Sequence, residues 1–145
     1  PTCLLVGTGM AADNAALSGM LATAGLGEAI RLLGRRSDIP AVMSALDLHV
    51  MSSNSEAFPN VLAEAMACGT PCVSTDVGDA AAILGVTGRI VPPRDPAALA
   101  AAIAGMLALR DGPDWQARRR IARQHVAEHF SLERMVENYR RVWYG

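Results

Sequence analysis

The 145-residue sequence contains no lysine, and its 13 arginines nearly balance 14 acidic residues, which leaves a net charge of −1. Nucleic-acid-binding surfaces need clustered positive charge, so the composition gives no sign of a nucleic-acid partner. We attribute the use of arginine in place of lysine to genome base composition and draw no function from it.

Long hydrophobic runs are absent as well. No apolar stretch approaches the roughly 20 residues that a membrane-spanning helix needs, and no signal peptide is visible. At 51% hydrophobic residues the chain can still bury a core, and its length suits one domain. We therefore expect a soluble, cytoplasmic domain without a transmembrane segment.

Cysteine is scarce, and the chain has no internal repeat or low-complexity tract. The chain has an odd number of cysteines, namely Cys3, Cys68 and Cys72. Their spacing fits neither a disulfide framework nor a zinc pattern. We expect reduced, buried thiols.

Short apolar runs alternate with helical patterns over residues 1–109. The runs are too short for helices and predict strands at 3–6, 29–33, 48–52, 72–75 and 89–91. Helical patterns fall at 10–24, 40–45, 59–68 and 96–109. This alternation is typical of the α/β class and predicts a Rossmann-like parallel sheet with helices on both faces, in three layers.

Residues 110–145 carry two longer helical patterns, at 114–128 and 132–144, and Ser131 is a good cap for the second. We expect them to complete one domain over residues 1–145. An apolar stripe repeats every three or four residues along the second helix, and core packing is its expected use. The stripe is formed by Leu132, Met135, Val136, Tyr139, Val142 and Trp143.

The most informative segment runs from Ser55 to Pro71 and holds two carboxylates, Glu56 and Glu64. Pro59 suits a first helical position and Gly69 a helix stop, so a short helix lies between them. Its first residues, Asn60 and Val61, offer free N–H groups and the positive end of the helix dipole. A diphosphate would fit there, and carboxylate oxygens suit sugar hydroxyls.

These residues resemble a known family. Residues 56–61 and 64–71 look like the donor-site motif of retaining glycosyltransferases of the GT-B fold, family four. Further stretches that resemble the family extend the likeness over almost the whole chain. They are residues 5–9, 33–40, 45–47, 74–79 and 91–96.

The resemblance implies roles for individual residues. Glu64 would hold the ribose hydroxyls of a nucleotide-diphosphate sugar, and Glu56, the catalytic candidate, would contact the transferred sugar. The backbone at Phe58, Pro59, Asn60 and Val61 would meet sugar and phosphate. Gly7 and Gly9 would line the donor cleft. No metal or other cofactor is implied, and Ala57 stands where the family usually has glycine.

The resemblance also implies a larger enzyme. The family's arginine and lysine that neutralise the donor diphosphate, the central strand of the sheet and the acceptor domain would all precede the strand at 3–6. We expect the chain alone to be inactive, and part of the last helix to lack its partner. We also expect a separate segment, a neighbouring molecule or a rearranged pairing to occupy the position of the central strand. The full enzyme could lie peripherally at a membrane and serve polysaccharide or glycolipid synthesis.

Two alternative functions stay open. Residues 7–12, Gly-Thr-Gly-Met-Ala-Ala, fit a dinucleotide fingerprint, and Arg35 stands near the next strand end, where a 2′-phosphate could sit. An NADP-binding domain would explain these residues but not Glu56 and Glu64. The other alternative is a nucleotide-sugar-binding module without turnover. Within the family resemblance, Arg35 is either a donor contact or part of a solvated turn.

The remaining polar residues receive structural interpretations. His125 and His129 are four apart on a helix, where a solvated face is more plausible than a metal site without a third ligand. His49 lies inside a strand pattern and is expected to be a hydrogen-bonded core residue. A cluster of four arginines could touch anionic lipid or the missing domain but is more simply a charged helix face. It comprises Arg118, Arg119, Arg120 and Arg123.

Overall fold

The computed structural model describes residues 1–145 and contains parallel strands alternating with helices. The chain divides into two compact units, Pro1–Ile39 and Pro40–Gly145. No helix is long and apolar enough to cross a membrane. The predicted α/β class with parallel pairing is confirmed.

The first unit is a β–α–β element. Strands β1 (Cys3–Val6) and β2 (Ile30–Gly34) pair in parallel, with Cys3 opposite Ile30, and helix α1 (Ala15–Thr23) connects them. The helix was expected from residue 10 but begins at residue 15. Asn14 is its cap: the side chain accepts from Leu17 N–H at 3.1 Å and donates to the Gly9 carbonyl at 2.8 Å. These two bonds hold residues 9–14 as a loop.

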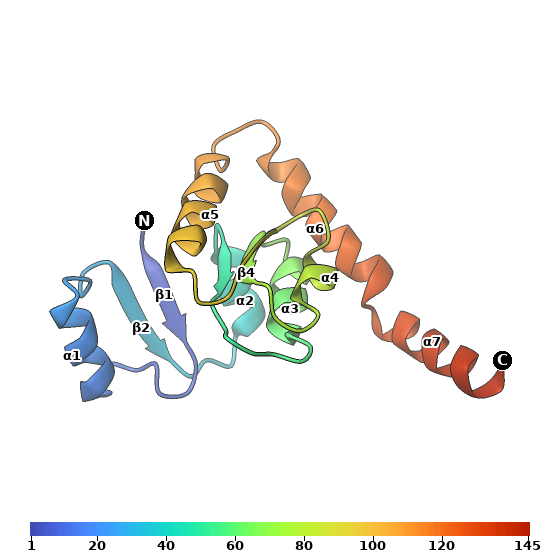
Figure 1. Ribbon diagram of the computed structural model, residues 1–145, viewed down its shortest axis with the longest axis horizontal. Helices are drawn as coiled ribbons and strands as arrows, with labels where there is room; N and C mark the ends of the chain where they lie inside the picture. Colours follow the sequence, from blue (N-terminus) through green and yellow to red (C-terminus); the bar gives the residue numbers. More distant parts are fainter. The chain divides into compact units, whose positions relative to one another are not determined.

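The second unit holds a three-stranded parallel sheet in the order β3–β4–β5 (Figure 1). Its strands are β3 (His49–Met51), β4 (Cys72–Thr75) and β5 (Arg89–Val91). Its first helices are α2 (Ile39–Ala45), α3 (Asn60–Ala67), α4 (Ala80–Leu84) and α5 (Pro96–Ala108). The sequence analysis did not predict helix α4. The chain's strands form two sheets, β1–β2 and β3–β4–β5, so the rearranged continuous sheet does not form.

Helices cover both faces of the second sheet, and the alternation along β4 shows how. Val73 packs with Met106 of α5 and with Trp115. The adjacent Cys72 points to the opposite face, because side chains alternate along a strand, and its sulfur lies 4.0 Å from the Leu62 carbonyl oxygen of α3. All four residues of β4 are buried, as expected for a central strand with both faces covered (Figure 1).

Helix α6 (Trp115–His129) packs beside α3. Two members of the predicted basic cluster reach carbonyl oxygens of neighbouring segments. Arg118 donates to Thr87 O at 3.1 Å, and Arg119 donates to Leu46 O at 3.4 Å and Ser44 O at 3.3 Å. These two arginines therefore tie α6 to the end of α2 and to the turn at Thr87, and they are not simply a solvated face.

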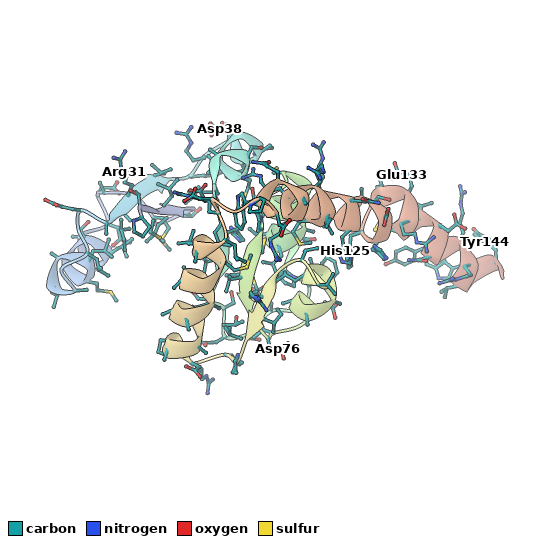
Figure 2. All side chains as sticks on the ribbon, turned by 90° about the horizontal axis from the view of Figure 1, so that it is seen from above. Arg31, Asp38, Asp76, His125, Glu133 and Tyr144 are labelled. Carbon is teal, nitrogen blue, oxygen red and sulfur yellow. The ribbon has the colours of Figure 1, made fainter.

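Helix α7 (Leu132–Tyr144) extends away from the rest of the second unit, as Glu133 and Tyr144 show in Figure 2. Ser131 caps it as predicted, accepting from Arg134 N–H at 3.2 Å. The expected core packing of its apolar stripe is wrong. No residue of α7 is buried, and Trp143 is 71% exposed. The stripe exists, but all six of its residues are exposed.

Two ionisable groups lie inside the second sheet. Burial lowers the pKa of His49, which favours its neutral form. Its Nε2 has no hydrogen-bond partner, so the expected hydrogen-bonded histidine is not observed. Burial raises the pKa of the Cys72 thiol to about 12, whereas Cys3 is exposed, contrary to the expectation that all three thiols are buried.

The thiols should therefore differ in reactivity. At pH 8, about four units below the pKa of Cys72, only about 1 in 10⁴ of its thiols is ionised, and the thiolate is the reactive form. With Ellman's reagent we expect Cys3 to react in the folded protein and Cys72 only after denaturation. The Cys72→Ala variant should lose only this slow thiol. Fast labelling that disappears in this variant would contradict the assignment.

Candidate functional site

The candidate site lies where two loops meet at the carboxyl edge of the second sheet. Met51 pairs with Ser74 in parallel, so the segments that follow β3 and β4 leave the sheet on the same side. Thr75 Oγ1 donates to the Ser53 carbonyl at 2.6 Å, and Asp79 N–H donates to the Ala57 carbonyl at 3.0 Å. The 53–59 loop is therefore tied at two points, once to the end of β4 and once to the 76–79 turn. Figure 2 labels Asp76 in this turn.

Gly78 makes the approach between the two loops possible. Its φ of +51° is in the left-handed region, which side chains rarely adopt. A Cβ at this position would overlap the carbonyl oxygens of both Glu56 and Ala57. These atoms belong to backbone and cannot rotate away. The absence of a side chain at Gly78 is thus a requirement for the observed path of the 53–59 loop.

The start of helix α3 differs in detail from the prediction. Pro59 is the residue before the first helical turn, and Asn60 is the first helical residue. Asn60 N–H donates to the Phe58 carbonyl at 2.9 Å, so it is not the free donor expected of an anion site. Val61 N–H has no hydrogen-bond partner within the chain and remains the free donor expected at a helix start.

Both predicted carboxylates are exposed beside this helix start. Glu56 Oε1 accepts from Ser53 Oγ at 2.8 Å, which holds the carboxylate against its own loop. Glu64 lies one turn into α3, on the face opposite the buried Leu62 and Met66. Neither carboxylate takes part in an ion pair. Their remaining oxygen lone pairs are free to accept hydrogen bonds from a ligand.

The other predicted site residues belong to the first unit. Gly7 (φ +144°) and Gly9 (φ +79°) form the turn after β1, where Gly7 N–H donates to the Gly34 carbonyl at 2.9 Å. Arg35 follows β2 and is exposed without an ion-pair partner. The neighbouring Arg36 instead pairs with Asp38, with Nε to Oδ1 at 2.8 Å, and this pair lowers the pKa of Asp38.

The turn after β1 does not have the geometry of the dinucleotide alternative. That fingerprint needs a helix whose N-terminus opens directly after the glycines, so that its free N–H groups meet the pyrophosphate. Here α1 starts only at Ala15, and the Asn14 side chain already occupies the N–H of Leu17. The structure therefore does not favour an NADP-binding domain.

The sequence did not predict a cluster of aromatic and imidazole rings that lies next to the 53–59 loop. Phe58 contacts Phe130, the residue after α6, with ring centroids 5.9 Å apart. His125, which is labelled in Figure 2, stacks on His129 with ring centroids 4.6 Å apart. Its Nε2 is buried without a hydrogen-bond partner, so the solvated-face interpretation is wrong for His125. No group of three or more possible metal ligands is present. Phe130 is 72 positions from Phe58, and no local pattern could have indicated their contact.

The comparisons with known proteins agree with this fold. Residues 1–108 match the family "Glycosyl transferases group 1". The chain is 35% identical over 144 residues to the D-inositol 3-phosphate glycosyltransferase of Mycobacterium marinum, covering 94% of this chain and 30% of that protein.

Solved structures give the same result. A glycosyltransferase from Rickettsia africae matches with a TM-score of 0.87 and 25% identity, over 99% of this chain and 40% of its own. The Anabaena protein Alr3699/HepE in complex with UDP matches with a TM-score of 0.82 and 28% identity, over 97% and 40%. The chain thus spans about a third of the length of such relatives. On these matches it belongs to the glycosyl transferases of group 1, as the C-terminal domain of a GT-B enzyme.

Proposed function

We propose that this chain is the donor-binding half of a retaining glycosyltransferase, which transfers a sugar from a nucleotide-activated donor to an acceptor hydroxyl with its anomeric configuration kept. The observation that carries the proposal is the pair of exposed, unpaired carboxylates, Glu56 and Glu64, on either side of the start of α3. The Anabaena relative, which has been solved with UDP and with UDP-glucose, supports the same class of ligand.

Each residue of the site has a role in this proposal. Glu64 accepts hydrogen bonds from the ribose hydroxyls, and Glu56 contacts the transferred sugar as the catalytic group. The free Val61 N–H and the positive end of the α3 dipole face the diphosphate. Because Asn60 N–H is occupied by the Phe58 carbonyl, the contributions of Phe58, Pro59 and Asn60 come from the shape of the backbone.

We also propose Gly7, Gly9 and Arg35, which belong to the first unit, as donor contacts. The two glycines present backbone without side chains, and the unpaired guanidinium of Arg35 is available to an anionic ligand. The domain would then comprise residues 1–145. Its α/β part would be residues 1–109, followed by C-terminal helices over 110–145.

The proposed mechanism relies on positioning and electrostatics. Holding the donor beside an acceptor removes much of the entropic barrier, and stabilising the charge of the leaving diphosphate lowers the rest. We propose that no metal or other cofactor takes part. The chain spans 30–40% of its relatives, and we propose that cations for the diphosphate and the acceptor domain lie elsewhere in the enzyme. Such an enzyme would act in the cytoplasm, peripherally at a membrane, in polysaccharide or glycolipid synthesis.

The first test of this function is the Glu64→Gln substitution. It keeps the shape of the side chain but removes charge-assisted hydrogen bonds worth roughly 1.5–3 kcal/mol. We expect UDP or GDP affinity of the full-length protein, measured by calorimetry, to fall at least tenfold with an unchanged melting temperature. Glu137→Gln, on the exposed face of α7, is the matched control and should bind as the wild type does. Equal affinity in the Glu64 variant would remove this residue from the site.

Gly78→Ala tests the loop that carries Glu56. The left-handed φ and the overlap with two carbonyls should cost at least about 1 kcal/mol of unfolding free energy and displace the loop, which weakens nucleotide binding. Gly105→Ala, inside α5 with no atom near its Cβ position, is the control and should be stabilising. Thermal unfolding and nucleotide titration of both variants give the comparison. If both variants are stabilised, the loop is not held as described.

The chain alone should bind nucleotide weakly and transfer no sugar. The proposed acceptor domain and diphosphate cations would be absent, so both the proximity and the electrostatic contributions would be lost. The assay incubates the 145-residue protein and the full-length enzyme with labelled UDP- and GDP-sugars and with lipid or sugar acceptors. Transfer by the chain at a rate near that of the full-length enzyme would mean that its catalytic groups are misplaced in this proposal. Nucleotide binding by a full-length enzyme that transfers no sugar would instead indicate a binding module.

A further inference from the structure

The carboxylate of Glu56 is held by one hydrogen bond within its own loop. Ser53 Oγ donates to Glu56 Oε1 at 2.8 Å, from a position three residues earlier in the chain. No other hydrogen bond or ion pair reaches this carboxylate, so Oε2 remains free to accept from a ligand. Without the serine hydroxyl, this exposed side chain would sample several rotamers and point in no fixed direction.

The sheet in turn fixes the backbone of Ser53. Its carbonyl oxygen accepts from Thr75 Oγ1 at 2.6 Å, and Thr75, the last residue of β4, is only 3% exposed. At the other end of this segment, the Ala57 carbonyl accepts from Asp79 N–H at 3.0 Å. The backbone on both sides of Glu56 is therefore anchored, and the freedom that remains is that of the Glu56 side chain. The Ser53 hydroxyl restricts this freedom directly.

The second carboxylate of the site is held in another way. Glu64 lies within α3 and takes part in no ion pair. Its position depends on the helix, which is anchored by its buried face. The Val61 N–H belongs to the same helix. Loss of the Ser53 hydroxyl would therefore act on Glu56 and leave the nucleotide end of the site unchanged.

We propose that Ser53 is a positioning residue for Glu56. Its hydroxyl holds one carboxylate oxygen, and the Thr75 hydroxyl holds Ser53, so that Glu56 presents Oε2 to the transferred sugar in one direction. In this proposal Ser53 does not contact the donor and acts only through Glu56. The inference rests on the proposed transferase function and adds to it a residue that precedes the donor motif.

The test compares the two ends of the donor site in the full-length enzyme. Ser53→Ala removes the hydroxyl from a partly exposed position and leaves the backbone bond to Thr75 in place. With the UDP- or GDP-sugar that the wild type uses, kcat should fall about tenfold, which corresponds to about 1.4 kcal/mol. The affinity for UDP or GDP alone should change less than twofold, with an unchanged melting temperature. Ser53→Thr, which keeps the hydroxyl, should restore kcat.

Two further variants show whether Ser53 acts through Glu56. In a Glu56→Ala background, Ser53→Ala should cause no further loss of kcat, because the group that it positions is gone. Ser44→Ala is the matched control. Its hydroxyl makes a bond of the same length within α2, 2.8 Å to the Pro40 carbonyl, and its removal should leave kcat unchanged.

Several results would overturn the proposal. A further loss of kcat in the Glu56→Ala background would show that Ser53 acts by itself, and a low kcat in Ser53→Thr would show that the hydroxyl is not the determining group. Parallel losses of kcat, nucleotide affinity and melting temperature in Ser53→Ala would show a purely structural role. If Glu56→Ala loses kcat while Ser53→Ala behaves as the wild type, the transferase function stands and only the positioning role fails. A wild-type enzyme that uses no nucleotide sugar removes the function itself.

Discussion

The 76–79 turn meets the carbonyl oxygens of Glu56 and Ala57 at a separation that no side chain at position 78 would allow, and the geometry of the candidate site depends on this contact. It arises from the parallel register of β3 and β4, which brings the two loops to the same edge of the sheet. Once the loops meet, the Asp79 and Thr75 hydrogen bonds restrict the path of the chain into α3. The position of the helix start relative to Glu56 is therefore a consequence of sheet pairing and not of the motif alone.

Electrostatics around this helix start are less simple than the motif suggests. A free helix N-terminus carries a partial positive charge spread over its unpaired N–H groups, but Asn60 N–H is already occupied by the Phe58 carbonyl. The two carboxylates are exposed, where charge–charge interactions are weak and screened by salt. Recognition of a ribose diol by Glu64 would thus depend on hydrogen-bond geometry more than on net charge. The rigidity of α3, with Leu62, Ala65 and Met66 buried, supplies that geometry.

Local patterns predicted the parts of the fold that local chemistry determines. The strands at 3–6, 72–75 and 89–91 and the cap at Ser131 were predicted correctly, because apolar runs and capping side chains act over a few residues. Helix α4 has only five residues, too few to show a helical period. The late start of α1 follows from the hydrogen bonds of Asn14, a residue outside the dinucleotide fingerprint at residues 7–12. The contact of Phe58 with Phe130 and the burial of His125 Nε2 depend on how α6 packs against α3 and α4, which no single segment encodes. Donor binding by the predicted site residues can be tested only with a ligand, and it stays a prediction.

The apolar stripe of α7 marks the limit of pattern-based inference. Its spacing was recognised correctly, since periodicity indicates that a helix has one apolar face. Periodicity does not say what covers that face, because burial depends on the surrounding tertiary structure, and here all six residues of the stripe are exposed. The helix nevertheless has a direct connection to the site. Phe130 follows α6 and precedes Ser131, the cap of α7, so the residue whose ring contacts Phe58 lies directly between the two helices.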